Sequence, residues 1–540
     1  MMKFLLLAVL LLVLSACGGE SPELAQLDPD FATFVANDGD DQPDETHNQE
    51  QESDVDIIPT FDNHLNIAMP LPRTLNPLLN SDPYLAQVLR LIFEPIVIFD
   101  ESLQPVANPA IIESIVFAPS GQSLTITLHQ NIFWEDGTPI TSADIAFTID
   151  VLRHQSPATA VYRPNVAYIV SHNAVDIHSL HINLRYPMWQ MKYLLDFPII
   201  PREYYQPVSM TNLTHPRNMH PVGNGSFRFY DYILASRLEL IPNTNAPGGR
   251  PLINGVTAHV LRDMSDVAHA FEGGVVDVLS ANATDWGRFR ATGKNEGGII
   301  ASRDFDFIGF NHNRTIFAER DVRVAIASVL DWDGLLARYY HGAERAFAPL
   351  NPLSWLSVNI EQPAYTTFAH AGFVLGDDGF LQRQASPALP PMRLTLDIIV
   401  NEENATSVNV AQLLARGLLD EGAYVELHIL PSNQFQTRLN NGNFDLVVGT
   451  TTLSNHPTMD FIMGYNSNYL SNLLHQSNRA ANQQVLASSA TDIQHYFSEN
   501  LPIIGIAFRN QVLFTARHLS GDFHTSSNSI FWNVQSWHIE

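Results

Sequence analysis

Hydrophobic and polar positions follow two different periods along the chain after residue 63. Alternation with a period of two predicts half-buried strands, and 123–134 shows it most regularly. Continuous apolar runs predict strands that are buried on both faces, and these occur at 443–450 and 502–508. Further strands are predicted at 64–70, 237–243, 255–261 and 393–401.

Apolar residues at helical spacing lie between these strands. The segment 319–340 is predicted to be helical, and 406–430 reads as a helix, a turn and a strand. A helix running into a strand is predicted over 85–99, with the helix stopped near Pro95. The 540 residues exceed what one hydrophobic core serves, so two or three domains are expected. The class is α/β with mixed sheets.

The run FWEDGTPITSADIAFTI, residues 133–149, concentrates an aromatic pair, two acids and a turn. Phe133 and Trp134 are predicted to end a strand, and the following Asp-Gly pair is a strong turn signal. Thr141 is placed to cap a helix, with Asp144 three residues later. Adjacent acids diverge, whereas paired catalytic carboxylates converge from separate elements. We therefore interpret this run as architecture and not as an active site.

The first seventeen residues, MMKFLLLAVLLLVLSAC, contain an apolar run that is too short to span a bilayer. The run ends in LSAC and is followed by Gly18 and Gly19, which resembles a bacterial lipoprotein signal. We expect residues 1–17 to be the signal and lipobox, with cleavage before Cys17 and lipid attached to its thiol. Cys17 is the single cysteine, which excludes an intramolecular disulfide.

Charge is unevenly distributed along the chain. Thirteen acids and no Lys or Arg occur between Glu20 and Asp56, so 18–60 is predicted to be an acidic, disordered tether. A calcium-binding stretch would also be acidic, but these acids lack loop spacing. The formal net charge of −27 argues against a nucleic-acid partner.

Several segments, in order, resemble the family 5 extracellular solute-binding proteins, the peptide receptors of ABC importers. The resemblance spans about 61–540 and includes the run 133–149. Its other segments are LNPLLNSDPYLAQVLRLIFEPIVIFDESLQPVANPAIIES, PVGNGSFRFYDY, FEGGVVDV, FIGFNHNRTIFAERDVRVAIASVLD, NNGNFDLVVGT and ENLPIIGIAF. The resemblance implies a type II periplasmic-binding-protein-like fold of the large cluster C form. Such a fold has two lobes, an extra N-terminal-side domain and hinge crossings.

This resemblance also implies a domain order. The chain crosses between lobes near 306–311 and 502–508, and the lobes close around the ligand by a hinge motion. The expected parts are lobe I at 61–78, the extra domain at 79–190, lobe I again at 191–305, lobe II at 306–505 and the return to lobe I at 506–540.

The implied function is capture of a peptide and its delivery to the permease subunits of an ABC importer. In the family's peptide receptors, an Asp after the strand that resembles 443–450 binds the peptide ammonium group. This chain has Leu453 at the Asp position and Thr450 at the preceding Trp position. An apolar residue cannot neutralise an ammonium group. The ligand therefore has no free amino terminus there, another acid such as Asp460 takes the role, or peptide binding is lost; we favour the first.

Further ligand contacts are implied more weakly. Ser81, Asp82 and Pro83 match a loop that pairs through its backbone with a bound peptide. Gly449 and Thr451 match main-chain contacts, and Thr450 and Thr452 belong to the same candidate segment, although strand-end polarity explains the threonines equally well. Two asparagines near the presumed hinge complete the candidate set, although turn capping explains them as well. They are Asn311 and Asn313.

The sequence is compatible with several competing functions. His456 lies beside the candidate segment, where nickel-chelate receptors of the family use a His, but a lone His does not define a metal site. A haem receptor, an oligosaccharide receptor and a signalling lipoprotein that kept the fold are also compatible with it. GxSxG and HExxH are absent from the sequence, which disfavours a secreted enzyme. We expect a monomer without cofactor, outside the cytoplasm, in the periplasmic space or on the outer face of the cell membrane.

Overall fold

The computed structural model describes residues 63–154, 161–208, 210–282, 295–340, 342–361, 363–384, 390–523 and 529–540. The predicted signal, Cys17 and the predicted tether lie outside these ranges. Within the described ranges, every helix is too short or too polar to cross a membrane.

The described chain begins in a four-stranded sheet of order β1-β10-β9-β8. Its strands are β1 (His64–Pro70), β8 (Phe227–Ile233), β9 (Arg237–Pro242) and β10 (Gly255–Leu261). β1 is parallel to β10, with His64 opposite Gly255, although the two strands are far apart in sequence. Leu65, Ile67 and Met69 are buried and alternate with partly exposed neighbours, as the period of two predicts. The residues between β1 and β8 are therefore inserted into this sheet.

A second four-stranded sheet lies within that insertion. It is antiparallel and has the order β4-β5-β7-β6. Its strands are β4 (Ile112–Phe117), β5 (Ser123–Leu128), β6 (Ile169–Ala174) and β7 (Ser179–Leu184), and α2 (Ser142–His154) packs on β6 and β7. The insertion also contains α1 (Pro83–Leu89), β2 (Val97–Phe99), β3 (Pro105–Ala107), α3 (Met191–Leu194), α4 (Arg202–Tyr205) and α5 (Pro216–Met219).

The strand predicted over 123–134 is shorter than expected. β5 ends at Leu128, because the chain turns at Asn131, whose φ of 59° is incompatible with an extended strand. Phe133 instead forms an isolated bridge with Pro139, across a turn in which Gly137 has a φ of 83°. The predicted turn is confirmed, and the predicted strand end is wrong.

The start of α2 departs in detail from the predicted cap. The Thr141 hydroxyl donates to Asp144 Oδ2 over 3.0 Å, and the Thr141 N–H donates to the same oxygen over 2.8 Å. The acid therefore does the capping and Thr141 is the donor. The two adjacent acids diverge as predicted, since Glu135 accepts from the Gly223 N–H and Asp136 accepts from Thr138.

The second half of the chain builds a five-stranded sheet of order β18-β17-β19-β13-β20. Its strands are β13 (Asp304–Phe310), β17 (Thr395–Asn401), β18 (Tyr424–Leu430), β19 (Leu446–Thr452) and β20 (Ile504–Phe508). β17 is parallel to β18 and β19, whereas β13 is antiparallel to β19 and β20. Leu446, Val447 and Val448 are all buried, which confirms the prediction for this strand over its first half.

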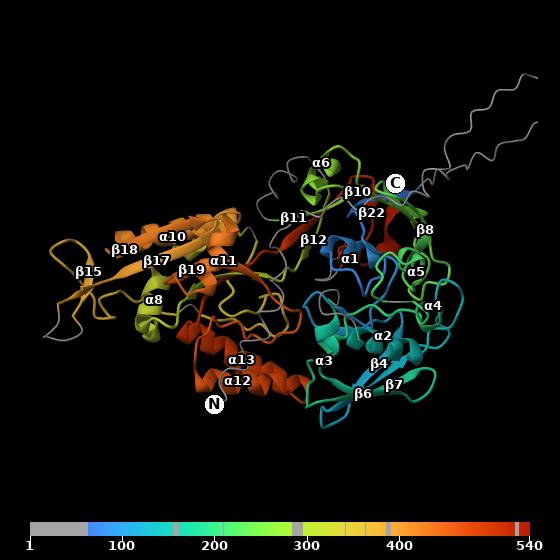
Figure 1. The fold of residues 1–540 in the computed structure, drawn as a ribbon, viewed down its shortest axis with the longest axis horizontal. Helices are drawn as coiled ribbons and strands as arrows, with labels where there is room; N and C mark the ends of the chain where they lie inside the picture. Colours follow the sequence, from blue (N-terminus) through green and yellow to red (C-terminus); the bar gives the residue numbers. More distant parts are fainter. Residues whose placement is uncertain are drawn as a thin grey trace, which may run out of the picture. The chain divides into compact units, whose positions relative to one another are not determined.

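Helices cover both faces of this sheet. On one face, Leu414 of α10 (Ala405–Asp420) and Ile326 of α8 (Arg320–Ser328) share a core with Ile398. On the other, α12 (Asn468–Asn478) and α13 (Gln483–Asn500) pack against Ile399. Figure 1 shows α10 lying along β17 and β18, and α12 and α13 side by side. The remaining elements of this half are α9 (Trp332–Tyr339), α11 (Ser432–Asn440), β14 (Val374–Leu375), β15 (Leu381–Arg383) and β16 (Met392–Arg393).

A three-stranded sheet of order β11-β21-β12 lies at the chain crossings. It contains β11 (Val278–Asn282), β12 (Asn295–Ile300) and β21 (Gln511–Thr515), with α6 (Val267–Glu272), β22 (Leu519–Ser520) and β23 (His538–Ile539) nearby in sequence. The chain passes from β12 to β13 through 301–303, and from β20 to β21 through 509–510. The segments 306–311 and 502–508, where the crossings were expected, lie mostly within β13 and β20. A hinge motion at these crossings stays a prediction.

Candidate ligand-binding site

A cavity of about 450 Å³ lies where the crossings meet the end of β19. Its volume falls within the range of small-molecule binding sites. Half of its lining residues come from 451–461, here called the 451–461 segment, which includes the end of β19 and continues beyond it. The other walls come from the crossing at 301–303, the loop 349–354, and single residues of distant elements, among them Phe99, Tyr193 and Phe508.

Aromatic rings form part of the apolar wall of this cavity. Phe99 and Tyr193 lie with their ring centroids 5.8 Å apart, and Phe508 packs on Phe305 at 5.1 Å. The Tyr193 hydroxyl accepts a hydrogen bond of 2.7 Å from Trp355 Nε1. Burial raises the pKa of Tyr193, so this hydroxyl stays neutral. A flat or aliphatic part of a ligand would find matching surface here.

His456 lines the cavity but is already bound within the protein. Its Nε2 is hydrogen-bonded to Gln190 Oε1, and since that oxygen only accepts, Nε2 carries the proton. Burial lowers the pKa of His456 to about 4, so the ring is neutral at pH 7. Across the residues that the structure describes, no group of three or more His, Cys, Asp or Glu is arranged to hold a metal ion.

Asn455 links the 451–461 segment to the N-terminal half of the chain. Its Nδ2 donates to Asp196 Oδ2 over 2.9 Å, and Asn165 Nδ2 donates to Asp196 Oδ1 over 2.8 Å. Burial raises the pKa of Asp196, while the charges of Arg90 and Arg303 act in the opposite direction. The amide of Asn455 is therefore held in place beside the cavity.

The structure separates the residues that the sequence grouped together at the end of β19. Thr451, Thr452 and Leu453 line the cavity. Thr450 instead donates to Asp306 Oδ1 over 2.5 Å, and Gly449 lies against the ring of Phe307. β19 ends at Thr452, so the cavity is lined by the residues at the end of this strand, whereas Gly449 and Thr450 lie further back within the sheet.

The remaining candidate residues have local structural roles and do not line this cavity. Asn311 Nδ2 donates to the carbonyls of Gly442 and Phe444, and Asn311 Oδ1 accepts from the Asn313 N–H. Asp82 caps α1 by accepting from the N–H groups of Tyr84 and Leu85. The candidates Ser81 and Pro83 flank this capping residue in the sequence, and Pro83 is the first residue of α1.

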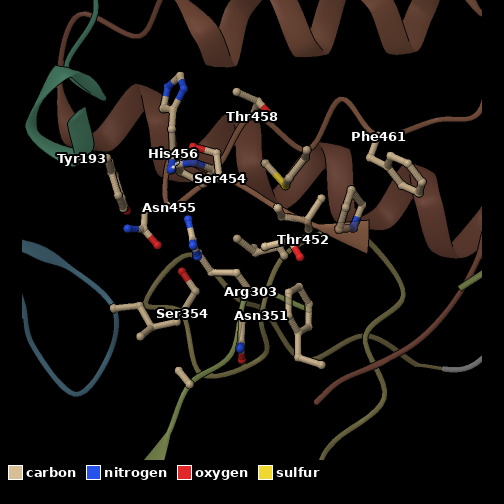
Figure 2. Close-up of a pocket in the computed structure, with 18 of the residues that line it drawn as sticks. Tyr193, Arg303, Asn351, Ser354, Thr452, Ser454, Asn455, His456, Thr458 and Phe461 are labelled. Atoms are coloured by element: carbon tan, nitrogen blue, oxygen red, sulfur yellow. Dashed lines mark hydrogen bonds between the residues drawn. The ribbon is translucent and has the colours of Figure 1, made fainter. Parts of the chain in front are cut away.

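Arg303, Asn351 and Ser354 also line the cavity, and sequence reasoning missed them. Figure 2 shows the Arg303 side chain extending into the cavity toward Asn455. The Leu453 N–H donates to the Arg303 carbonyl over 2.9 Å, which continues the pairing of β13 with β19. Antiparallel pairing of 443–450 with the strand after residue 303 would have placed Arg303 beside Leu453, but the sequence does not state which strands pair.

The two-lobed α/β fold with a cavity beside its crossings is that of an extracytoplasmic solute-binding protein. Residues 107–472 match the profile of the bacterial extracellular solute-binding proteins, family 5, and the chain belongs to this family. The family is one of substrate-binding receptors that serve ABC importers. The fold class and the family inferred from the sequence motifs are thereby confirmed.

Individual relatives are distant from this chain. A putative ABC transporter peptide-binding protein of Brucella ovis is 25% identical over 47% of the chain, and the chain spans only 48% of that relative. The oligopeptide-binding protein AppA of Bacillus subtilis is 20% identical over 86% of the chain and 89% of its own length.

Solved structures show the same fold. The structure of AppA from Bacillus subtilis in complex with a nonapeptide has a TM-score of 0.62 at 19% identity, covering 88% of this chain and 99% of AppA. NikZ from Campylobacter jejuni in complex with Ni(L-His) has a TM-score of 0.66 at 18% identity, covering 88% of this chain and 99% of NikZ.

Proposed function

We propose that this protein captures a peptide or peptide-like solute that has no free amino terminus and delivers it to an ABC-type import permease. The observation that carries the proposal is Leu453, an apolar residue in the wall of the cavity. An ammonium group enclosed beside Leu453 would lose its hydration without gaining a charge partner. The cavity volume and its aromatic wall support an organic solute, and the peptide-binding names of relatives support a peptide.

The test compares free-amine trialanine with N-acetyl trialanine by calorimetry. We expect the free-amine peptide to bind poorly to the unmodified protein. Leu453→Asp should improve its binding by about tenfold, because a carboxylate then partners the ammonium group. Leu234→Asp is the matched control, since Leu234 is 79% exposed in a turn outside the cavity. Sub-micromolar binding of the free-amine peptide to the unmodified protein would contradict the proposal.

The ligand residues that we propose are Thr451, Thr452 and Leu453. A non-peptide solute is the second candidate, and the same Leu453 favours it because nothing in that part of the wall requires a peptide terminus. A nickel chelate would need a free His456, whereas Nε2 of this ring is hydrogen-bonded to Gln190. Ligand-dependent thermal stabilisation by metal-free peptides but not by nickel–histidine separates these candidates.

We also propose that the protein is held at the membrane by lipid on Cys17, as a monomer. The support is the LSAC sequence after a short apolar run. Full-length protein expressed in a bacterial host is expected to partition into the detergent phase of a Triton X-114 extract. Cys17→Ser should move it to the aqueous phase, whereas Ser15→Ala should not. Aqueous partitioning of the unmodified protein would contradict lipid attachment.

A further inference from the structure

Arg303 occupies the cavity wall beside Leu453 and has features of a ligand-binding residue. It lies in the crossing between β12 and β13, is exposed, and its carbonyl is fixed by the Leu453 N–H. The side chain extends into the cavity (Figure 2). Its neighbour Ser302 is fixed as well, since the Ser302 N–H donates to Asn510 Oδ1 and Asn351 Nδ2 donates to the Ser302 carbonyl. The backbone that carries Arg303 is therefore tied on both sides.

The guanidinium group of Arg303 differs in its partners from those of Arg314 and Arg509. Within the described ranges, no carboxylate forms an ion pair with it, whereas Arg314 and Arg509 each have a buried carboxylate partner. The charge of Arg303 acts to lower the pKa of Asp196, but the Asp196 carboxylate accepts its hydrogen bonds from Asn165 and Asn455. An arginine that lines a cavity, and whose N–H donors have no carboxylate acceptor in the protein, can bind an anion there.

Besides Arg303, the lining contains one acid, Asp460, and the two form no ion pair in the part of the chain that the structure describes. Asp460 is exposed and accepts a 2.6 Å hydrogen bond from the Thr458 hydroxyl. Leu453 contributes an apolar surface to the same wall. A ligand carboxylate placed at Arg303 would gain a bidentate partner, while an ammonium group at the same place would be repelled.

We propose that Arg303 is a specificity-determining residue that binds an anionic group, such as a carboxylate, of the captured solute. The proposal rests on the proposed function, because it names the charge of the ligand that the same cavity takes. It goes further, because a solute must not only lack an ammonium group in order to bind. It must also carry a negative group that reaches Arg303. A neutral, doubly blocked peptide is then a poor ligand.

The experiment uses three trialanine derivatives that differ in charge and in its position. They are N-acetyl trialanine amide, which is neutral, N-acetyl trialanine with a free carboxylate, and N-succinyl trialanine amide, whose carboxylate lies at the other end. Citrate serves as a probe without peptide bonds. Calorimetry is run on the full chain with Arg303→Gln, Arg303→Lys and the control Arg73→Gln, an exposed arginine outside the cavity.

We expect at least one carboxylate-bearing peptide to bind the unmodified protein about tenfold more tightly than the neutral one. Arg303→Gln should remove this gain, Arg303→Lys should keep part of it because charge without the planar fork remains, and Arg73→Gln should keep all of it. Because the guanidinium has no carboxylate partner among the described residues, melting temperatures of the Arg303 variants should match that of the unmodified protein.

The outcomes separate the two proposals. Equal binding of the three peptides, or a carboxylate preference that survives Arg303→Gln, overturns the role of Arg303 and leaves peptide capture standing. Binding of citrate that depends on Arg303, without binding of any peptide, overturns peptide capture and supports the anion site. Binding of none of the four probes overturns both.

Discussion

Glu135 has an unusual environment for a residue that looks catalytic in the sequence. Its carboxylate accepts a 3.1 Å hydrogen bond from the Gly223 N–H, and Asn245 Nδ2 donates to its carbonyl over 3.1 Å. Burial raises the pKa of Glu135 from 4.5 to about 7, against the opposing effects of the Gly223 hydrogen bond and the charge of Arg228. The shift arises where the turn after Trp134 packs against residue 223, and needs no catalytic role.

This pKa predicts a pH dependence of stability. Between pH 4.5 and about 7 the folded protein keeps the Glu135 proton, whereas the unfolded chain releases it. The unfolded state therefore binds fewer protons, and stability falls as the pH rises through this window. The free energy of unfolding should therefore fall less in Glu135→Gln than in the unmodified protein between pH 4.5 and 8. We expect the difference to be roughly 1–3 kcal/mol, as measured by urea unfolding across this pH range.

The comparison is between variants, because other groups also titrate in that window. Glu135→Gln and the unmodified protein should have similar stabilities near pH 4.5, and the variant should be the more stable one at pH 8. Glu113→Gln changes an exposed acid of β4 and should follow the unmodified protein throughout. Parallel curves for Glu135→Gln and the unmodified protein would mean that Glu135 is ionised in both states.

The sequence predicts which single residues line the cavity less well than it predicts where strands lie. The run at 450–453 is evident as a candidate, but its members divide between the cavity and the Asp306 carboxylate. That division depends on where the end of β19 meets the crossing at 301–303, and this position is fixed by pairing with β13. Arg303 belongs to the cavity for the same reason. Pairing partners distant in sequence are not encoded in the local pattern.

At the scale of elements, a buried polar cluster joins β13, β19 and the second crossing. Asp306 is 1% exposed, and both of its carboxylate oxygens accept a hydrogen bond from Arg509 Nε, over 2.8 and 2.9 Å. Tyr340 and Thr450 also donate to Asp306, each over 2.5 Å. Arg509 follows β20 directly, so this ion pair fixes the end of the five-stranded sheet where the chain leaves it.

Removal of one partner of this pair should be costly. Arg509→Gln leaves the buried Asp306 carboxylate with neutral donors, and we expect a loss of roughly 3 kcal/mol in the free energy of unfolding. Asp306→Asn combined with Arg509→Gln should recover part of that loss, since no uncompensated buried charge then remains. Urea unfolding of the two single variants and the double variant gives the coupling free energy.

An exposed ion pair supplies the control for this cycle. Arg393 and Asp378 are 46% and 45% exposed, so Arg393→Gln should cost less than about 1 kcal/mol. A loss for Arg509→Gln as small as that for Arg393→Gln would show that water reaches Asp306 and screens its charge. Additive effects of Asp306→Asn and Arg509→Gln would contradict the coupling.

Elements themselves were predicted well wherever the pattern is local. The strand at 64–70 and the helix and strand of 406–430 follow from periodicity, because burial on one face imposes that period. The end of β5 was missed because Asn131 turns the chain while the apolar pattern continues through Phe133. Periodicity could not supply the sheet order β18-β17-β19-β13-β20, since β20 joins this sheet from far along the chain.

At the scale of the whole molecule, hydrogen bonds connect residues near 190 with residues of the C-terminal half. Gln190 is fully buried, bonded through Oε1 to His456 and through Nε2 to Ser477 Oγ over 3.3 Å. The adjacent Trp189 N–H donates to the Ala480 carbonyl over 2.7 Å. These bonds hold the 451–461 segment and α12 against the N-terminal half, beside the cavity. Ligand capture by closure would form or strengthen such contacts.

Gln190→Ala tests whether these contacts support binding. The variant leaves the buried His456 N–H without an acceptor, and an unsatisfied buried donor costs about 1–3 kcal/mol. An open arrangement would return His456 to water, so the variant should favour that arrangement. We expect about tenfold weaker binding of the preferred trialanine derivative and a larger radius of gyration in small-angle scattering without ligand.

The control distinguishes closure from general destabilisation. Gln206→Ala removes an exposed glutamine side chain at the end of α4 and should change neither binding nor scattering. Gln190→Glu should keep part of the binding at pH 7 that Gln190→Ala loses, since a carboxylate accepts from His456 Nε2 and its charge raises the His456 pKa. Unchanged affinity together with an unchanged radius for Gln190→Ala would show that closure does not depend on these bonds, and the crossings at 301–303 and 509–510 would then have to set the preferred arrangement alone.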